Sequence, residues 1–288
     1  MGAALTSLTK KFRMYMALTK SLQTGLLIIT GLAGYMSARC PVFHLGALVG
    51  VGISLYLAIA GSTILNMWWD RDIDSKMKRT QMRPLSSGEL DPAEALRLGL
   101  VLSLLGVGLA VAMDALYGLI VFAGLFFDVV IYTIWLKRRT CWGIIWGGIS
   151  GGMPILAGRA FGVGTIDSIG ILLSLGILFW IPTHILTFSM KYFDDYKAAG
   201  IPTFASTYGF EATRITIAIS NIFASLAMGL SAWAIGVTVL HLCSLAILSL
   251  ILLAMAVISV YRPTERMNHG MFKYASVYML LAMLLMVF

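Results

Sequence analysis

Apolar residues fill most of the chain in long stretches that are separated by polar connections. A membrane-spanning helix needs about 20 consecutive apolar residues, and the hydropathy pattern contains nine stretches of roughly that length. They lie at about residues 22–38, 45–65, 96–113, 116–136, 142–161, 168–190, 213–234, 238–260 and 271–288. The pattern therefore predicts an all-α polytopic membrane protein with nine transmembrane helices.

The composition also favours a membrane protein. Hydrophobic residues make up 59% of the 288 residues, charged residues only 12%, and the mean hydropathy is +0.89, which is more apolar surface than a soluble core can use. The cysteines, Cys40, Cys141 and Cys243, lie far apart without a CxxC spacing, so neither a disulfide framework nor a zinc site is indicated. Because no small-residue cleavage site accompanies the first apolar stretch, we expect a span there rather than a signal peptide.

Membrane topology accounts for the positive charge. A formal net charge of +8 could suggest a nucleic-acid partner. Alternating the connections across the membrane, however, places 19 of the 21 Lys and Arg residues on the side of the amino terminus, and only Arg39 and Arg159 on the other. Because cytoplasmic loops collect basic residues, we expect a cytoplasmic amino terminus and an external carboxyl terminus. Nucleic-acid binding is not needed to explain the charge.

The first acidic cluster follows the second apolar stretch. Asn66, Asp70 and Asp74 are spaced at i, i+4 and i+8, so on a helix they point in one direction, while Asp72 points roughly the other way. Carboxylates and an amide oxygen on one face suit Mg²⁺, which binds one or two carboxylates together with waters and substrate phosphate oxygens. The pattern alone fits a metal and diphosphate site and a solvated charged loop equally well.

The second acidic cluster, Asp194 and Asp195, follows the sixth apolar stretch on the same predicted side of the membrane. Pro182 interrupts that stretch, and proline is tolerated in a span where the helix faces protein or a wet cavity. His184 lies in the same segment, and Lys191 follows about two turns later. This histidine is either a functional residue or an ordinary hydrogen-bonded contact between helices.

The two clusters occupy equivalent positions in two halves of one domain that covers residues 1–288. The first half contains spans one to four and the second half spans five to nine, each with its acidic loop after its second span. We therefore expect the two clusters to face each other across a central cavity. Because both lie on the predicted cytoplasmic side, we expect the active site on the cytoplasmic face.

Three further features bear on the chemistry. Lys137, Arg138 and Arg139 end the fourth stretch and are either membrane-surface charges or partners for a diphosphate, for which Arg offers bidentate geometry. Asp128 lies inside an apolar stretch, where it is either neutral and hydrogen-bonded or placed against the cavity. The glycines from residue 147 to residue 152 favour close packing of the fifth span against its neighbours.

Five segments together resemble the UbiA-type intramembrane prenyltransferases, in particular the branch that prenylates haem. The first is Asn66-xxx-Asp70-Arg71-Asp72-Ile73-Asp74 with Met77, Arg79-Thr80 and Arg83-Pro84-Leu85. The others are Leu18-Thr19-Lys20; Tyr132-Thr133-x-Trp135-Leu136-Lys137-Arg138-Arg139-Thr140; Gly147-Gly148 to Pro154; and Trp180-x-Pro182-x-His184 with Lys191, Asp194-Asp195-Tyr196 and Ala199-Gly200-Ile201-Pro202. The resemblance covers roughly residues 15–210. Ser21 and Gly143 depart from it, where proline and asparagine are usual.

The resemblance implies a nine-helix bundle of the UbiA type that binds Mg²⁺ and farnesyl diphosphate and transfers the farnesyl group to a vinyl carbon of haem B. It implies a metal and diphosphate site made of Asn66, Asp70, Asp74, Asp194 and Asp195. The cations expected around the diphosphate are Arg79, Arg83, Lys137, Arg138 and Lys191. His184 is expected on the haem side, and Asp72, Tyr132 and Tyr196 are possible additional site residues. Lys191 stands about where other members of the superfamily carry an aspartate, which favours haem as the acceptor.

Two other functions remain open. A related enzyme could use another acceptor, such as a quinone precursor, a chlorin or a glycerol-phosphate lipid precursor, and product analysis would distinguish these. Intramembrane polar residues also mark transport paths, so a secondary transporter is the candidate from another class. Transporters place their sites near the middle of the bilayer, whereas these carboxylates gather at one membrane face, which counts against transport.

Overall fold

The computed structural model describes residues 11, 13–38 and 44–287, and these residues form helices and no β-strand. The long helices are α2 (Ser21–Ser37), α3 (Leu45–Trp69), α5 (Pro92–Met113), α6 (Ala115–Phe126) with its continuation η1 (Phe127–Leu136), α7 (Gly143–Val163), α8 (Ser168–Lys191), α10 (Phe204–Ile235), α11 (Val239–Tyr261) and α12 (Glu265–Val287). The short helices α4 (Arg71–Asp74) and α9 (Phe193–Ala198) follow α3 and α8. The predicted all-α class is confirmed, and every predicted stretch falls on one long helical segment. Arg39 and Cys40 lie outside the described residues.

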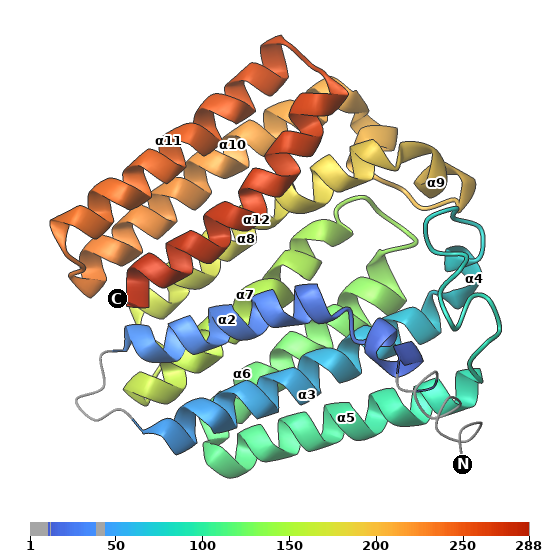
Figure 1. Cartoon of the computed structure of the whole chain (residues 1–288), viewed down its shortest axis with the longest axis horizontal. Coiled ribbons are helices and arrows are strands. Elements are labelled where there is room, and N and C mark those ends of the chain that lie inside the picture. The colour runs from blue at the N-terminus through green and yellow to red at the C-terminus, as the bar shows by residue number, and fades with distance from the viewer. Residues whose placement is uncertain (1–10, 12, 39–43, 288) are drawn as a thin grey trace, which may run out of the picture.

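The helices that are long and apolar enough to cross a membrane number seven in the described part of the chain, with α6 and η1 counted as one. The other two predicted spans are α2, which has only 17 residues, and α7, which is rich in glycine. Both lie between α3 and α5 on one side and α8 and α12 on the other (Figure 1). The chain is therefore an integral, multi-pass membrane protein.

Three helices begin several residues earlier than the apolar pattern predicts, and one of them, α5, begins at Pro92 rather than near residue 96. α10 begins at Phe204 rather than near residue 213, because the Thr203 hydroxyl caps it by accepting the Ser206 N–H at 3.1 Å. This early part is set off by a bend at Gly209, whose φ of 85° favours glycine. α12 begins at Glu265 rather than near residue 271. None of these early segments is a continuous apolar run, so a hydropathy pattern does not register it.

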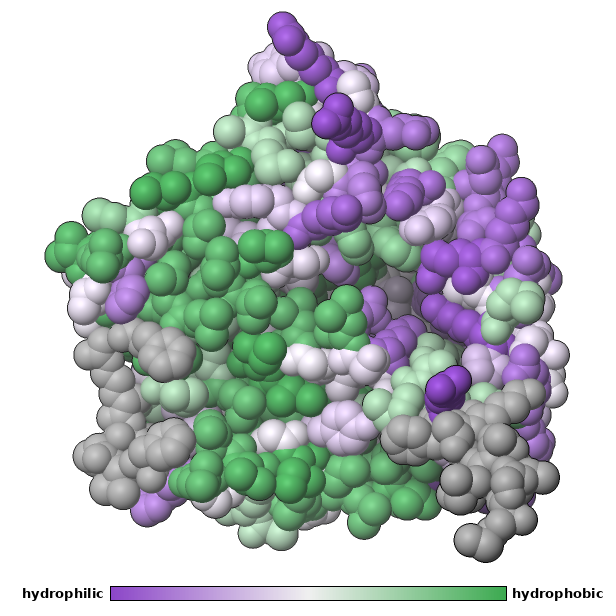
Figure 2. All heavy atoms as spheres, viewed as in Figure 1, coloured by the Kyte–Doolittle hydropathy of each residue, from purple (hydrophilic) through white to green (hydrophobic). Residues whose placement is uncertain are grey.

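The surface of the bundle is apolar along the helices and hydrophilic at one end. Many large apolar side chains are exposed, for example Leu104 at 72%, Trp233 at 72% and Leu240 at 73%. Figure 2 shows hydrophobic residues over most of the visible face and hydrophilic residues gathered at the end that carries α4 and α9. Exposed apolar area on this scale fits contact with lipid chains and not with water.

The centre of the fold is the contact between α2 and α7. A Cβ added at Gly158 would collide with the carbonyl oxygen of Gly31, so the two backbones touch. One apolar core lies between this pair and α3, α5 and α6, and the other lies between it and α8, α10, α11 and α12. The close packing predicted for the fifth span is confirmed, because a Cβ at Gly148 or Gly151 would press on α8 side chains.

A charged network joins three helices at the end of the bundle away from α4 and α9. Arg159 of α7, only 6% exposed, donates to Asp167 through Nε and Nη2 at 2.7–3.0 Å and to the Ser37 carbonyl oxygen at 2.8 Å. Asp167 also accepts the Gly170 N–H at the start of α8. The hydrogen bonds from Arg159 lower the pKa of the Asp167 carboxyl. Arg159, one of the two exceptions to the charge asymmetry, thus holds α2, α7 and α8 together.

Candidate active site

The end of α3 and the short helix α4 place the first acidic cluster at one end of the bundle. α3 ends at Trp69, and Asp70 is its C-cap. Hydrogen bonds from the Asp70 N–H to the Asn66 carbonyl (2.9 Å) and from the Asp74 N–H to the Asp70 carbonyl (2.8 Å) keep the helical register across the break. As the spacing predicts, Asp70 and Asp74 are both buried, 3% and 5% exposed, while Asp72 is exposed.

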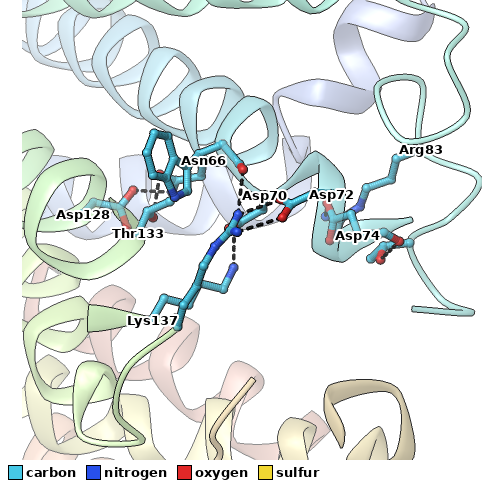
Figure 3. A network of polar contacts seen from close by, with 11 residues as sticks. Asn66, Asp70, Asp72, Asp74, Arg83, Asp128, Thr133 and Lys137 are labelled. Carbon is cyan, nitrogen blue, oxygen red and sulfur yellow. Dashed lines mark hydrogen bonds and ion pairs between the residues drawn. The ribbon is translucent and has the colours of Figure 1, made fainter. Parts of the chain in front are cut away.

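Each aspartate of this cluster is paired with one of the cations that the sequence suggested for a diphosphate site (Figure 3). The pairs are Asp70 with Lys137, Asp74 with Arg83 at 2.6 Å, and Asp72 with Arg138 at 2.7 and 2.8 Å. Arg138 also donates to the Trp69 carbonyl oxygen at 2.8 Å. Arg138 therefore links the end of η1 to the end of α3. Its two hydrogen bonds to the Asp72 carboxylate are a bidentate contact, which Arg can make and Lys cannot.

The pairing shifts the pKa of groups in these connections. Burial alone would lower the pKa of the Lys137 amine, but the adjacent Asp70 carboxylate raises it above its ordinary value. Hydrogen bonds from Arg138 lower the pKa of the Asp72 carboxyl. Lys137 and Asp72 are therefore charged at neutral pH.

A further cation, Lys20, lies close to the same cluster. It precedes α2 in the left-handed conformation, with φ 44° and ψ 57°, which costs a residue with a side chain about 1–2 kcal/mol. Burial lowers the pKa of its amine to about 8, and the charges of Arg83 and Lys137 act in the same direction. Asp128 and Asp74 act the other way. Lys20 was not among the predicted site residues, although it belongs to the resembling segment Leu18-Thr19-Lys20, because a single lysine beside a span is typical of membrane-surface snorkelling.

The first cluster fits a hard divalent cation. Oδ1 of Asp70 is buried and makes no hydrogen bond, and the Arg138 Nη2 atom lies 3.7 Å from it. Within the described ranges, no three His, Cys, Asp or Glu side chains come close enough together to hold a metal ion by themselves. Mg²⁺ is usually bound by one or two carboxylates plus substrate phosphates, so a site completed by a diphosphate suits this arrangement.

Asn66 is held by two residues of η1, the π-helical continuation of α6. Its Nδ2 donates to Asp128 Oδ2 at 2.8 Å, and its Oδ1 accepts from the Thr133 hydroxyl at 2.8 Å. The Ser62 hydroxyl donates to the same Asp128 oxygen. Figure 3 shows Asp128 and Thr133 on one side of Asn66 and Asp70 on the other. The sequence left the role of Asp128 open, and the structure shows a hydrogen-bonded carboxylate.

The second acidic cluster lies on α9 and meets the loop that follows the first. The Arg79 backbone N–H donates to Asp195 Oδ2 at 3.3 Å. Beside this contact, Tyr196 packs against buried apolar residues of both loops, namely Ile73, Met77, Ala199 and Ile201. Asp194 is exposed. The structure thus brings Asp195 next to the first cluster and leaves Asp194 outside this contact.

Two of the predicted cations lie apart from the carboxylates. The Arg79 guanidinium stacks over the rings of Phe188 and Tyr192, with centroids 4.8 and 5.4 Å away. Lys191 is exposed, and its Nζ lies 3.5 Å from His269 Nδ1 on α12. Their assignment to a diphosphate stays a prediction.

His184 belongs to a column of aromatic rings between α8 and α12. Its imidazole stacks on Trp180 and on Phe272, with centroid distances of 5.2 and 4.5 Å. Its Nδ1 lies 3.4 Å from the Ser276 hydroxyl. Phe188 extends the column toward Arg79. His184 therefore contacts α12, and the column joins it to the loop of the first cluster.

Lys137 also lines a small pocket. Its volume is about 50 Å³. Its polar lining includes Tyr132, Lys137 and Tyr196, and its apolar lining includes Ile144, Ile185, Leu186 and Phe204. Two of the possible additional site residues, Tyr132 and Tyr196, thus share one surface with the Lys137 amine.

Comparison with known proteins connects this geometry to enzymes. The model of the UbiA prenyltransferase family matches residues 27–284. A protoheme IX farnesyltransferase from Archaeoglobus fulgidus is 42% identical over 220 residues, which cover 76% of this chain and 75% of the relative. One from Ruegeria pomeroyi is 36% identical over 279 residues, which cover 93% and 86%.

Solved structures share the fold at low sequence identity. A digeranylgeranylglyceryl phosphate synthase has a TM-score of 0.79 at 18% identity, covering 96% of this chain and 98% of its own. A UbiA homologue from Archaeoglobus fulgidus bound to GPP and Mg²⁺ has a TM-score of 0.68 at 15% identity, covering 96% and 100%. By the family match over most of its length, supported by these likenesses, the chain belongs to the UbiA prenyltransferase family.

Proposed function

We propose that this prenyltransferase is Mg²⁺-dependent and transfers a farnesyl group from farnesyl diphosphate to a vinyl carbon of haem B, which makes haem O. The observation that carries the proposal is the buried first cluster, where Asp70 and Asp74 lie among cations and Asp195 approaches from the second cluster. The names of the relatives at 36–42% identity support the donor and the acceptor.

The diphosphate site is made by residues of both clusters. The residues that would hold Mg²⁺ are Asn66, Asp70, Asp74, Asp194 and Asp195. Oδ1 of Asp70, which makes no hydrogen bond, is one oxygen available to the ion. The chemistry that Mg²⁺ supplies when bound is positive charge against the oxygens of the departing diphosphate. Lys137 and Arg83, now on Asp70 and Asp74, are placed to donate to diphosphate oxygens on the same side.

The remaining protein groups orient the site and exclude water. Asp72 and the Trp69 carbonyl hold the Arg138 guanidinium with three hydrogen bonds, which fixes its direction at the edge of the site. Breaking the allylic C–O bond leaves a carbocation that any nearby water would capture. The apolar lining beside Lys137 keeps water away until the vinyl carbon bonds to C1 of the donor. Water then adds its hydroxyl to the haem-side cation and a proton is released.

The acceptor side is the aromatic column around His184. The rings of Trp180, His184 and Phe272 stack on one another, and Phe188 extends this column toward Arg79 in the loop of the first cluster. We place His184 at the haem, where an imidazole can bind the iron or a propionate. A UbiA enzyme with another acceptor is the alternative, and the same assay distinguishes the two.

The proposal also sets the orientation in the membrane. α4 and α9 lie at one end of the bundle and the end of α12 at the other (Figure 1), so the charge asymmetry puts the active site and the amino terminus on the cytoplasmic face. A membrane-impermeant thiol reagent applied to spheroplasts tests this with the exposed Lys78→Cys and Ile166→Cys in a background lacking the native cysteines. We expect only Ile166→Cys to react from outside, and the reverse labelling would contradict the orientation.

The deciding experiment is an assay of purified protein in detergent with Mg²⁺, farnesyl diphosphate and haem B, with the porphyrin product identified by mass spectrometry. We expect a farnesyl-hydroxyethyl haem that disappears when Mg²⁺ is chelated. Product from a different acceptor, with haem B unchanged, would keep the prenyl transfer and refute haem as the acceptor. Asp70→Ala is the inactive control, because it removes the central carboxylate.

A further inference from the structure

The segment η1 is a π-helix of ten residues, Phe127–Leu136. In a π-helix each N–H bonds five residues back, and the Lys137 N–H does so with the Tyr132 carbonyl at 2.8 Å. Residues five apart therefore lie on one face. In an α-helix they would be turned about 140° from each other, at 3.6 residues per turn. Asp128 and Thr133 are five apart and share the face that meets Asn66.

These two residues hold opposite ends of one amide group. Asp128 Oδ2 accepts two hydrogen bonds, from Ser62 and from Asn66 Nδ2, so only the NH₂ end of the amide can face it. The Thr133 hydroxyl donates to the other end, Oδ1. An amide held at one end only could rotate and exchange its oxygen and nitrogen. Held at both ends, it keeps its oxygen in one place, with one lone pair left for another partner.

We infer that Asp128 is a positioning residue, which acts through Asn66 by fixing which end of its amide is presented to the cation and the diphosphate. This rests on the proposed function of Asn66 as a ligand. A carboxylate inside a span is costly, and Asn or Ser at position 128 could fill the space and bond Ser62. Neither would fix the amide, because both can donate as well as accept. Lys20, close enough to interact with Asp128 electrostatically, offsets the charge.

The test measures cation binding apart from catalysis. Mn²⁺ is titrated into purified protein that holds a non-reactive farnesyl thiodiphosphate, and free Mn²⁺ is followed by electron paramagnetic resonance. We expect Asp128→Asn to raise the Mn²⁺ dissociation constant about tenfold, as for the loss of a hydrogen bond to a charged group. Val130→Ala, on an exposed position of the same π-helix, should leave it unchanged.

A second substitution separates positioning from a structural role. Asn66→Asp alone sets two carboxylates against each other and should weaken Mn²⁺ binding. In the double variant with Asp128→Asn, the amide at position 128 donates to the carboxylate at position 66, so the hydrogen bond between the two positions is restored. The double variant should therefore bind Mn²⁺ within about threefold of the wild type. Wild-type binding by Asp128→Asn, or additive losses in the double variant, would overturn the inference.

Two further outcomes are informative. If Asp128→Asn does not fold, Thr133→Val decides, because it frees only the oxygen end of the amide and should weaken Mn²⁺ binding several-fold; unchanged binding there would overturn the inference. If the wild type itself binds no Mn²⁺ in the presence of the thiodiphosphate, the proposed function has failed, which is distinguishable from failure of the role of Asp128.

Discussion

Lys137 and Asp70 form the ion pair that most directly links stability to function. Asp70 is 3% exposed, its Oδ2 accepts from Lys137, and its Oδ1 makes no hydrogen bond. Replacing Lys137 by Met leaves the carboxylate buried with only the Arg138 Nη2 atom 3.7 Å away. Breaking a buried pair from one side costs about 3–5 kcal/mol. Because each kcal/mol shifts the midpoint by roughly 2–4 °C in a chain of this size, we expect Lys137→Met to melt at least about 6 °C lower.

The double variant Asp70→Asn with Lys137→Met separates the two roles. It removes the unpaired charge, so most of the lost stability should return, while prenyl transfer should stay at least about a hundredfold down because both the carboxylate and the cation are gone. Thermal unfolding in detergent, followed by tryptophan fluorescence, measures the first, and diphosphate release the second. Arg139→Met, an exposed neighbour, is the control. If Lys137→Met melts with the wild type, Asp70 does not depend on this pair and the reasoning is refuted.

Four other substitutions test separate parts of the structure. Asp195→Ala should abolish diphosphate release, while Asp194→Ala should cost less than about tenfold, because Asp194 is exposed and only Asp195 contacts the loop of the first cluster; equal losses would contradict this difference between the two ligands. Arg159→Met should lower stability by about 3 kcal/mol, measured by thermal unfolding, with the turnover of the folded fraction unchanged. Because the pKa of Asp167 is lowered, its pairing stabilises the fold above the ordinary Asp pKa of about 4 and is lost as the pH falls below it. The wild type should therefore lose more stability than Arg159→Met between pH 5 and about pH 3, and parallel losses would contradict this. Gly158→Leu should prevent accumulation of folded protein, measured by size-exclusion chromatography, because a side chain there meets the Gly31 carbonyl.

The fold could be predicted from the sequence because a bilayer imposes one length on each apolar helix. All predicted stretches fall on helices. The largest errors in their starts are at Phe204 and Glu265, where the first residues of the helix are not a continuous apolar run. The register of Asn66, Asp70 and Asp74 was predictable too, since it depends on one helical period.

The partners within the site could not be predicted. Which cation pairs with which carboxylate depends on how η1 packs on α3. Lys137 and Arg138 are adjacent basic residues in the sequence, yet Lys137 binds Asp70 and Arg138 binds Asp72. The π-helix was missed for a related reason: the residues between Phe127 and Leu136 are mostly apolar, so neither period leaves a polar stripe that could distinguish it. Without it, Asp128 and Thr133 could not be placed on one face.

The π-helix also sets what kind of sequence variation this segment tolerates. Asp128 and Thr133 both reach Asn66 because they are five positions apart on a π-helix. The number of residues between these two positions therefore matters more than which residues they are. Inserting one residue, for example after Val130, would leave a span apolar and long enough to insert into the bilayer, yet it would place Asp128 and Thr133 six positions apart, where they no longer share a face, and would detach one end of the amide. Among descendants of this chain, substitutions between these two positions should therefore be common, and insertions there should be rare.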